Sequence, residues 1–215
     1  MAERGRPRNF DRAQALQKAM EVFWSKGYEG ASLADLTVAM GINSPSLYGA
    51  FGSKEELFRE AVGLYRDTEG GSARRALQAA ATAREGVQAM LLTSAERFTV
   101  SGRPPGCMIV LGAPSGCTNH ASVGDFLGDT RRDMQSCILA RMNAGAAQGE
   151  LPASADLKGL AAFYTTVLHG MSIQARDGAT RKTLQAVARQ AMCAWDALTG
   201  HHVPPSGVPP GRARS

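Results

Sequence analysis

Apolar residues recur at steps of three and four positions along most of the chain, a pattern that predicts amphipathic helices rather than strands. The first such segment spans residues 13–23, and Gly27 and Gly30 are expected to end it. The apolar residues of this segment share one helix face; they are Ala13, Leu16, Met20 and Phe23. We therefore expect one long helix near the start of the chain.

Two short helices joined by a tight turn are expected next. Ser32 and Asp35 form a capping box, in which the side chain of each residue accepts the backbone amide of the other. Gly41 ends that helix, because glycine tolerates the positive φ of a sharp turn. Ser44 is expected to cap the following helix, with Pro45 at its first position, where a missing amide costs nothing. The residues expected to face the core are Leu33, Leu36, Met40, Leu47 and Phe51.

A second capping box, over residues 53–56, predicts the start of a fourth helix. The buried face of that helix is expected to hold Leu57, Phe58, Ala61 and Leu64. Residues 32–51 thus have the pattern typical of a helix-turn-helix with a longer helix on each side. A helical hairpin with no role in DNA binding has the same periodicity, so the spacing alone leaves both interpretations open.

The later part of the chain is also helical in pattern, so we expect an all-α fold of about nine helices. Gly70 and Gly71 break or kink the fourth helix, and residues 101–106 form a loop. The further expected segments are helices over 73–83, 84–100, 122–147, 155–176 and 180–198, and a short apolar segment over 107–113. Residues 200–215 are rich in proline and glycine and are expected to be disordered.

The composition agrees with a helical protein. The chain is rich in alanine, and aromatic residues make up only 6%. No apolar run is longer than Cys107–Leu111, which is too short to span a membrane, and no apolar stretch of the kind found in a signal peptide follows the N-terminal arginines. The 4 cysteines stand at irregular spacings, which argues against a disulfide framework. We therefore expect a cytoplasmic protein.

The net charge of +5 permits nucleic-acid binding without establishing it. Four arginines, Arg4, Arg6, Arg8 and Arg12, lie within the first twelve residues. Such a segment is either a solvated end of the chain or a basic arm that reaches for phosphates or a minor groove. The second interpretation gains weight because a predicted helix-turn-helix follows.

The chain resembles the TetR family of bacterial transcriptional repressors over about residues 9–66. The segments that carry the resemblance are Ala31–Leu36, Met40–Ile42, Ser46–Tyr48, Phe51 and Lys54–Phe58. Downstream, a weaker likeness includes Gly106 and Cys107, residues 149–152 and two long closing helices. The resemblance implies an all-helical homodimer that blocks or controls a promoter and releases the DNA when a small molecule binds.

The resemblance also implies two domains. Residues 1–53 would form a three-helix DNA-binding domain with a basic arm over 1–9, and residues 54–199 a ligand-binding and dimerisation domain in which 54–82 is the linking helix. Because a twofold protein matches a twofold site, the expected partner is a palindromic operator in double-stranded DNA at the nucleoid.

In a helix-turn-helix the second short helix lies in the major groove. Ser46 can bond a base edge or a phosphate, while Tyr48 offers a ring to a thymine methyl, or else packs on the domain surface. Lys54 stands in the first turn of a helix, where the dipole disfavours a cation unless it meets a phosphate. The candidate DNA-binding residues are Arg6, Arg8, Thr37, Asn43, Ser44, Ser46, Tyr48, Gly49 and Lys54. Glycine at position 49 leaves no side chain to contact a base there.

For the second domain the resemblance implies a ligand pocket and a dimer interface made by the last two long helices. The candidate pocket residues, which could equally belong to the core, are Phe98, Met108, Phe126, Met134, Phe163, Tyr164 and His169. The candidate interface residues, which could equally serve the chain's own core, are Leu168, Val187, Ala191, Ala194, Trp195 and Leu198.

Three other classes of function have weaker support in the sequence. No hydrolase, nucleotide-binding or metalloprotease motif is present, so we expect no catalytic residues and no cofactor. Cys117 and His120 have the spacing of half a zinc site, but such sites use two such pairs, so we expect no metal. Cys107 is either a small buried residue or a redox-sensing or electrophile-sensing thiol, because a helix start favours thiolate.

Overall fold

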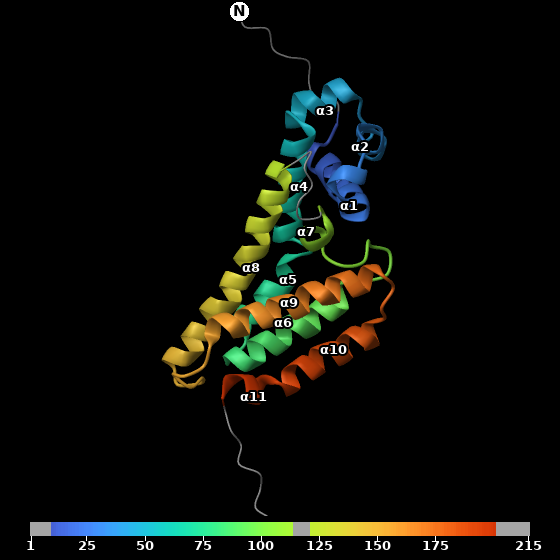
Figure 1. The fold of residues 1–215 in the computed structure, drawn as a ribbon. Coiled ribbons are helices and arrows are strands. Elements are labelled where there is room, and N and C mark those ends of the chain that lie inside the picture. Colours follow the sequence, from blue (N-terminus) through green and yellow to red (C-terminus); the bar gives the residue numbers. More distant parts are fainter. Residues whose placement is uncertain (1–9, 114–120, 201–215) are drawn as a thin grey trace, which may run out of the picture.

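The computed structural model describes residues 10–113 and 121–200, and within these ranges every regular element is a helix (Figure 1). The helices are α1 (Arg12–Gly30), α2 (Leu33–Met40), α3 (Ser44–Phe51), α4 (Lys54–Asp67), α5 (Gly71–Ala79), α6 (Ala83–Arg97), α7 (Met108–Leu111), α8 (Ala121–Ala147), α9 (Leu157–Arg176), α10 (Arg181–Cys193) and α11 (Trp195–Thr199). All but α7 and α11 have at least 8 residues, and the predicted all-α fold is confirmed. No helix in the described ranges is long and apolar enough to cross a membrane.

Helices α1–α4 form one end of the molecule, which we call the head, and α5–α11 form the other part (Figure 1). Helix α4 leads from the head toward α5, and α8 runs beside it. Arg66 of α4 pairs with Asp133 of α8, and Arg59 lies over the ring of Phe126. Contacts between α4 of the head and α8 therefore connect the head to the rest of the chain.

The helix starts follow the capping rules, with corrections at α3 and α4. At α4 the Ser53 side chain accepts the amide of Glu56, but the Ser53 amide donates to the carbonyl oxygen of Phe51, so the predicted capping box over 53–56 is only half formed. The capping box of Ser32 and Asp35 is present, and Gly41 ends α2 in the left-handed conformation, as predicted. The cap of α3, however, is Asn43 and not Ser44, because the Asn43 side chain accepts the backbone amide of Ser46 at 2.9 Å. The predicted helix over 180–198 is also two helices, because Ala194 donates its amide to Met192 and interrupts the ladder.

Helix α1 bends at Gly27, where the backbone has φ 71° and ψ 176°. A side chain there would meet the carbonyl oxygen of Gly112 at 3.0 Å, and the amide of Tyr28 donates to that same oxygen at 2.7 Å. Glycine is required because this conformation and this close approach both exclude a Cβ atom. The bend attaches the head to the segment that follows α7.

The buried apolar residues form two clusters. The first joins α1–α4 with Met108 of α7 and with Val123 and Leu127 of α8. The second runs from Leu77 of α5 to Trp195 of α11. The predicted linking helix over 54–82 is two helices, α4 and α5, and the buried residues of α4 belong to the core of the head. The division at residue 53 stays a prediction about folding units.

Candidate nucleic-acid interface and ligand cavity

Helix α3 presents an exposed surface on the head. Leu47 and Phe51 are buried beneath it, whereas the side chain of Tyr48 is 45% exposed. A Cβ atom at Gly49 would have no neighbour within 4 Å, so the surface beside Tyr48 is open. This arrangement leaves room for another molecule to approach the helix closely.

Two of the candidate DNA-binding side chains already have partners within the head. The carboxamide oxygen of Asn43 caps α3, which leaves its nitrogen as a donor. The hydroxyl of Thr37 donates to the carbonyl oxygens of Leu33 and Ala34, at 2.9 and 3.1 Å, and keeps its lone pairs as acceptors. Asn43 can therefore still donate a hydrogen bond to a ligand, and Thr37 can still accept one.

Arg12 stabilises the end of α3 and joins it to α4, a role that the sequence pattern did not suggest. Its guanidinium pairs with Glu60 at 2.8 Å, donates to the carbonyl oxygen of Ala50, and lies 4.3 Å from the centroid of the Phe51 ring. Arg12 is thus a structural residue and not part of the free basic arm. Arg6 and Arg8 lie outside the described residues, so their role in DNA binding stays a prediction.

Lys54 lies over the ring of Tyr28, with its Nζ atom 4.5 Å from the ring centroid. Burial lowers the pKa of this lysine, and Glu29 raises it. The ring holds the ammonium group beside the start of α4, close to the turn that follows α3. Lys54 is therefore held in place before any phosphate arrives.

If Lys54 contacts a phosphate, Lys54→Ala should weaken binding to every DNA sequence by a similar factor. The slope of log K against log salt should then fall by about one, because one fewer counterion is released. Fluorescence anisotropy over a salt series measures the slope. Lys158→Ala, on the exposed start of α9, removes the same charge far from the head and serves as the control. An unchanged slope for Lys54→Ala would show that Lys54 touches no phosphate.

A cavity of about 290 Å³ lies between the head and the second part of the chain. Trp24 of α1 and residues of α4–α9 line it. Three of the predicted pocket residues, Phe98, Met134 and His169, are in its wall. Burial lowers the pKa of His169, as does the nearby Arg131, so the imidazole is neutral at pH 7.

The other four predicted pocket residues lie outside this cavity. Tyr164 is fully buried, and its hydroxyl donates to the carbonyl oxygen of Ala191. Met108 is buried in the core of the head. Phe126 packs under Arg59, and Phe163 is exposed on α9. Helical spacing placed these side chains on inward or semi-inward faces, but it did not separate core from cavity wall.

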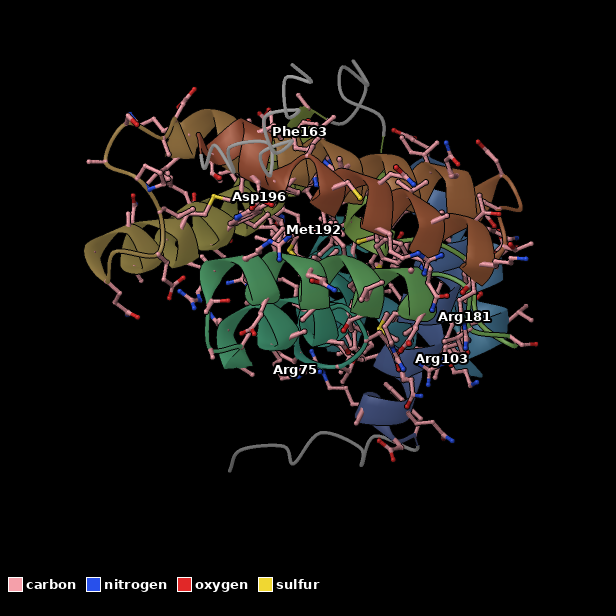
Figure 2. The ribbon with its side chains drawn as sticks, turned by 90° about the horizontal axis from the view of Figure 1, so that it is seen from below. Arg75, Arg103, Phe163, Arg181, Met192 and Asp196 are labelled. Carbon is pink, nitrogen blue, oxygen red and sulfur yellow. The ribbon has the colours of Figure 1, made fainter. Side chains whose placement is uncertain are left out.

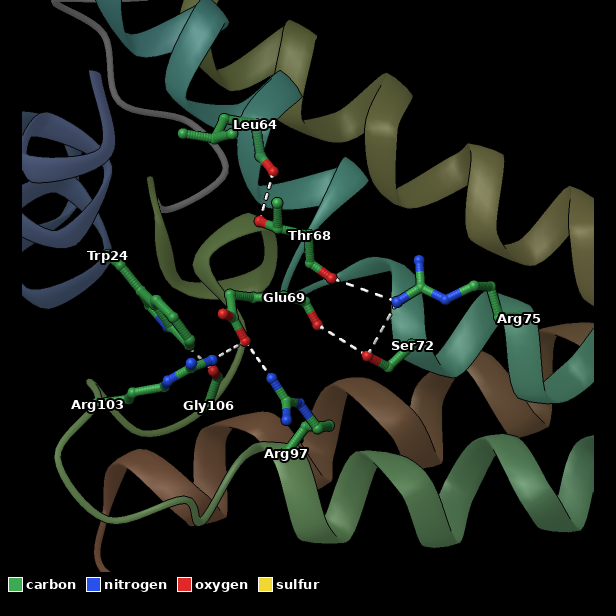
Figure 3. A network of polar contacts seen from close by, with 9 residues as sticks. All are labelled: Trp24, Leu64, Thr68, Glu69, Ser72, Arg75, Arg97, Arg103 and Gly106. Atoms are coloured by element: carbon green, nitrogen blue, oxygen red, sulfur yellow. Dashed lines mark hydrogen bonds and ion pairs between the residues drawn. The ribbon is translucent and has the colours of Figure 1, made fainter. Parts of the chain in front are cut away.

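The polar wall of the cavity includes Glu69, from the connection between α4 and α5 (Figure 3). Its carboxylate makes ion pairs with both Arg97 of α6 and Arg103 of the loop after α6, and it is 19% exposed. Arg131 of α8 also lines the cavity, and its guanidinium donates to the carbonyl oxygen of Ile109 at 3.1 Å. None of these charged residues was singled out from the sequence.

Cys107 also lines the cavity, immediately before α7. Burial is the main influence on the pKa of the Cys107 thiol and raises it, and the backbone of Val110, the Tyr65 side chain and the backbone of Ile109 act in the opposite direction. We therefore expect the sulfur to be protonated at neutral pH, in contrast to the thiolate that a helix start would favour alone.

Trp24 and Arg176 connect the cavity to the head. The indole nitrogen of Trp24 donates to the carbonyl oxygen of Gly106 at 3.0 Å. Arg176, at the end of α9, donates to the carbonyl oxygens of Trp24 and Ser25, both at 2.8 Å, and of Pro105 at 3.1 Å. One guanidinium thus joins α1, α9 and the loop that borders the cavity.

Replacing Arg176 should loosen this connection. Arg176→Met keeps an apolar stem of similar length and removes the donors to three carbonyl oxygens, so we expect a loss of about 2 kcal/mol in the free energy of unfolding. Arg181→Met, at the exposed start of α10, should change it by less than about 0.5 kcal/mol. Urea unfolding followed by circular dichroism measures both values. Equal effects would mean that the three bonds contribute nothing to stability.

The candidate dimer residues divide into three groups by exposure. Leu168, Ala191 and Trp195 are buried in the chain's own core, whereas Leu198 is 42% exposed. Val187 and Ala194 are half-buried. Phe163 and Ile173 of α9 are exposed at 39% and 49%, and Figure 2 shows Phe163 on the side of the helical layers away from Arg75. The exposed apolar side chains of α9 therefore lie on a different face of the helix from Leu168, the residue predicted for the dimer interface.

Cys117 and His120, whose spacing is that of half a zinc site, and the tail over 201–215 lie outside the described residues. Among the residues that the structure describes, no cluster of His, Cys, Asp or Glu is arranged to hold a metal ion.

Several known proteins are similar to the chain in sequence and structure. The family model described as "Bacterial regulatory proteins, tetR family" matches residues 15–61. The chain is 35% identical to the HTH-type transcriptional repressor ComR of Escherichia coli (strain K12) over 197 residues, which cover 91% of this chain and 93% of that protein. It is 32% identical to the HTH-type transcriptional repressor BdcR of the same strain over 190 residues, or 87% and 90% of the two chains. A solved structure of a cysteine mutant of the TetR family transcriptional regulator CifR, complexed with 26-bp double-strand operator DNA, is 49% identical with a TM-score of 0.85, and the match covers 88% of this chain and 100% of that chain.

Proposed function

The chain belongs to the TetR family of bacterial transcriptional regulators, and from this premise we propose that it is a repressor whose homodimer binds a palindromic double-stranded operator. A small molecule in the cavity favours an arrangement of the two heads that no longer fits successive major grooves. The two relatives from Escherichia coli are repressors, and the related solved structure contains operator DNA. We also propose that the protein works in the cytoplasm and has no catalytic activity of its own.

Trp24 is the observation that carries the proposal. It belongs to α1 of the head, and it lines the cavity. Its indole bonds the loop at Gly106, and its backbone carbonyl accepts a bond from Arg176 of α9. A molecule in the cavity therefore contacts the head directly, so binding energy gained in the cavity can bias the position of α3.

The binding residues proposed on the head are those of α3 and its flanks. Ser46 and Tyr48 contact bases or phosphates, Asn43 donates through its free amide nitrogen, and Lys54 meets a phosphate. Gly49 lets the DNA backbone or a base approach α3 closely, because a Cβ atom there has no neighbour within 4 Å.

Selection of DNA duplexes from a random pool tests this function and requires no known operator sequence. The selected sequences should share a palindrome with half-sites about 34–36 Å apart, or a small multiple of that distance. Tyr48→Ala should weaken binding to the selected duplex while leaving the unfolding temperature unchanged, because this ring is half exposed. A chain that enriches no sequence, or that is monomeric by light scattering at micromolar concentration, is not such a repressor.

A second candidate function is release of the operator by thiol chemistry at Cys107. The observation that favours it is the position of Cys107 in the cavity wall, where the backbone of Val110 and Ile109 and the side chain of Tyr65 act to lower the pKa of the thiol against the larger effect of burial. These groups would stabilise a thiolate as it forms, as they do in reactive cysteines. Because burial raises the pKa of the thiol, reaction requires an electrophile that first enters the cavity.

Alkylation by iodoacetamide tests the state of this thiol. The sulfur attacks the carbon that carries iodine, iodide leaves with the bonding pair, and the thiol proton passes to solvent. We expect Cys107 to react at least about tenfold more slowly than the exposed Cys193, as followed by mass spectrometry. If an electrophile releases the operator and Cys107→Ser prevents the release, the second function is supported; release that persists in Cys107→Ser rules it out.

A further inference from the structure

The cavity wall carries more positive than negative charge. Arg74 of α5, Arg97 of α6 and Arg131 of α8 all line it. The two carboxylates in the wall are Glu69 and Asp67, and Asp67 lies in the exposed rim. Arg66 of α4 also lines the cavity, but it is exposed and pairs with Asp133 of α8. Three partly buried guanidinium groups from three helices therefore share a space in which only one carboxylate is partly buried.

Glu69 is already engaged by two cations (Figure 3). Figure 3 shows its carboxylate between Arg97 and Arg103, and both contacts are ion pairs. Arg74 is half-buried and makes no ion pair with any residue in the described part of the chain. A partly buried charge without an ion-pair partner costs free energy, so a negatively charged group beside Arg74 would be favourable in this cavity.

Much of the rest of the wall is apolar, although Tyr65, Ser94, Thr130 and His169 also line it. Trp24, Phe98, Val110, Met134 and Leu168 contribute large apolar side chains. The volume of about 290 Å³ is at the lower end of the range for small-molecule sites. Such a wall suits a small molecule with an apolar body and one charged end.

We propose, on the basis of the function proposed above, that the cavity binds a small organic acid whose carboxylate takes the place of Glu69 on Arg97. The apolar body of the acid packs against Trp24 and the side chains of α7 and α8, and Arg74 and Arg131 add positive charge around the carboxylate. An arginine–carboxylate pair is the arrangement that gives such a site both affinity and orientation.

Displacement of Glu69 explains how binding reaches the head. Glu69 stands in the short connection between α4 and α5, next to Gly70, whose amide donates to the carbonyl oxygen of Tyr65 at 2.7 Å. A side chain at Gly70 would overlap the Tyr65 ring, so this connection is packed tightly on the end of α4. When Glu69 leaves Arg97, the end of α4 loses a fixed point, and α4 is part of the core of the head.

Acids compared with their own amides test the chemical class. The probes are hexanoate, octanoate, benzoate and phenylacetate, each beside the neutral amide of the same shape. We expect at least one acid to bind at least about tenfold more tightly than its amide by isothermal titration, since a charged hydrogen-bonded pair is lost in the amide. The same acid should release the selected operator duplex at concentrations that follow its binding curve.

Glu69→Gln gives the sharper test, because it removes the competing carboxylate. The acid should bind Glu69→Gln about tenfold more tightly than the unaltered chain, while the amide should bind both equally. Asp67→Asn makes the same change of charge at the exposed neighbouring carboxylate and is the matched control. Arg97→Gln, which keeps Glu69 and its pair with Arg103, should abolish the preference for acid over amide.

The outcomes separate this inference from the function on which it rests. If no acid binds more tightly than its amide, or if Glu69→Gln and Asp67→Asn change acid affinity equally, the assignment of an acid is wrong. Amides that bind and release the operator would leave ligand-controlled repression standing. A chain that enriches no DNA sequence fails as a repressor whatever the probes do.

Discussion

Gly106→Ala is expected to lower the free energy of unfolding by about 3 kcal/mol. Gly106 has φ 78°, where a residue with a Cβ atom is strained, and that atom would lie 2.6 Å from the carbonyl oxygen of Ser172. Two hydrogen bonds keep the backbone at Gly106 from moving away. Its carbonyl oxygen accepts from the indole nitrogen of Trp24, and its amide donates to the carbonyl oxygen of Phe98. The substitution should also disturb Cys107, whose amide donates to the Ser172 hydroxyl at 2.8 Å.

Gly102→Ala separates the two contributions to this loss. Gly102 belongs to the same loop and has φ 79°, but a Cβ atom there meets nothing within 4 Å. Gly102→Ala should therefore lower the free energy of unfolding only by the backbone strain, about 1 kcal/mol. Urea unfolding curves of the two variants give the difference. If the two losses are equal, the close approach to Ser172 contributes nothing and α9 is free to move away from the loop.

Phe58→Ala is expected to cost about 3–5 kcal/mol, the largest of the expected effects. Phe58 is fully buried, with ring centroids of Phe23 and Tyr28 at 5.0 and 5.1 Å in edge-on contact. It lies where α4 meets α1, so its loss leaves a cavity in the centre of the head. At about 2–4 °C for each kcal/mol in a chain of this size, the unfolding temperature should fall by roughly 10 °C.

Phe126→Ala on α8 is the matched control. Phe126 is half-buried under Arg59, so Phe126→Ala should lower the free energy of unfolding by about 1 kcal/mol. Phe58→Leu, which keeps most of the volume, should lose less than about 1.5 kcal/mol and should retain operator binding if Phe58→Ala does not fold. Thermal unfolding followed by circular dichroism measures all three. Similar losses for Phe58→Ala and Phe126→Ala would show that the packing of the head does not depend on this ring.

The head could be predicted from the sequence because local rules govern it. Capping side chains, glycine at Gly41 and apolar spacing act over a few residues, and the structure confirms the helices that they predict. One error, Ser44 in place of Asn43 as the cap of α3, is a shift of a single residue between two side chains that both cap well. The other is the capping box over 53–56, of which only the bond from the Glu56 amide to the Ser53 side chain forms.

The cavity could be predicted only in part, because tertiary contacts define it. Trp24, Glu69 and Arg97 come from three elements, and only packing brings them into one wall. Helical periodicity gives the inward direction of Tyr164 and of His169 alike, but it does not tell that the first meets Ala191 and the second meets the cavity. The positive charge of the wall is likewise invisible in the sequence, where arginines recur throughout.

The hydrogen bonds from Arg176 to the head can form only late in the synthesis of the chain. They join residues 151 and 152 positions apart, and the Trp24 bond joins residues 82 apart. Because the ribosome releases the N-terminus first, α1 leaves the exit tunnel long before α9 is synthesised. The carbonyl oxygens of Trp24 and Ser25 stay with water until nearly the whole chain has emerged, and closing so long a loop is slow. A chain truncated before α9 contains the entire helix-turn-helix but lacks the Arg176 bonds, so we expect the end of α1 to become fixed only once α9 has been made.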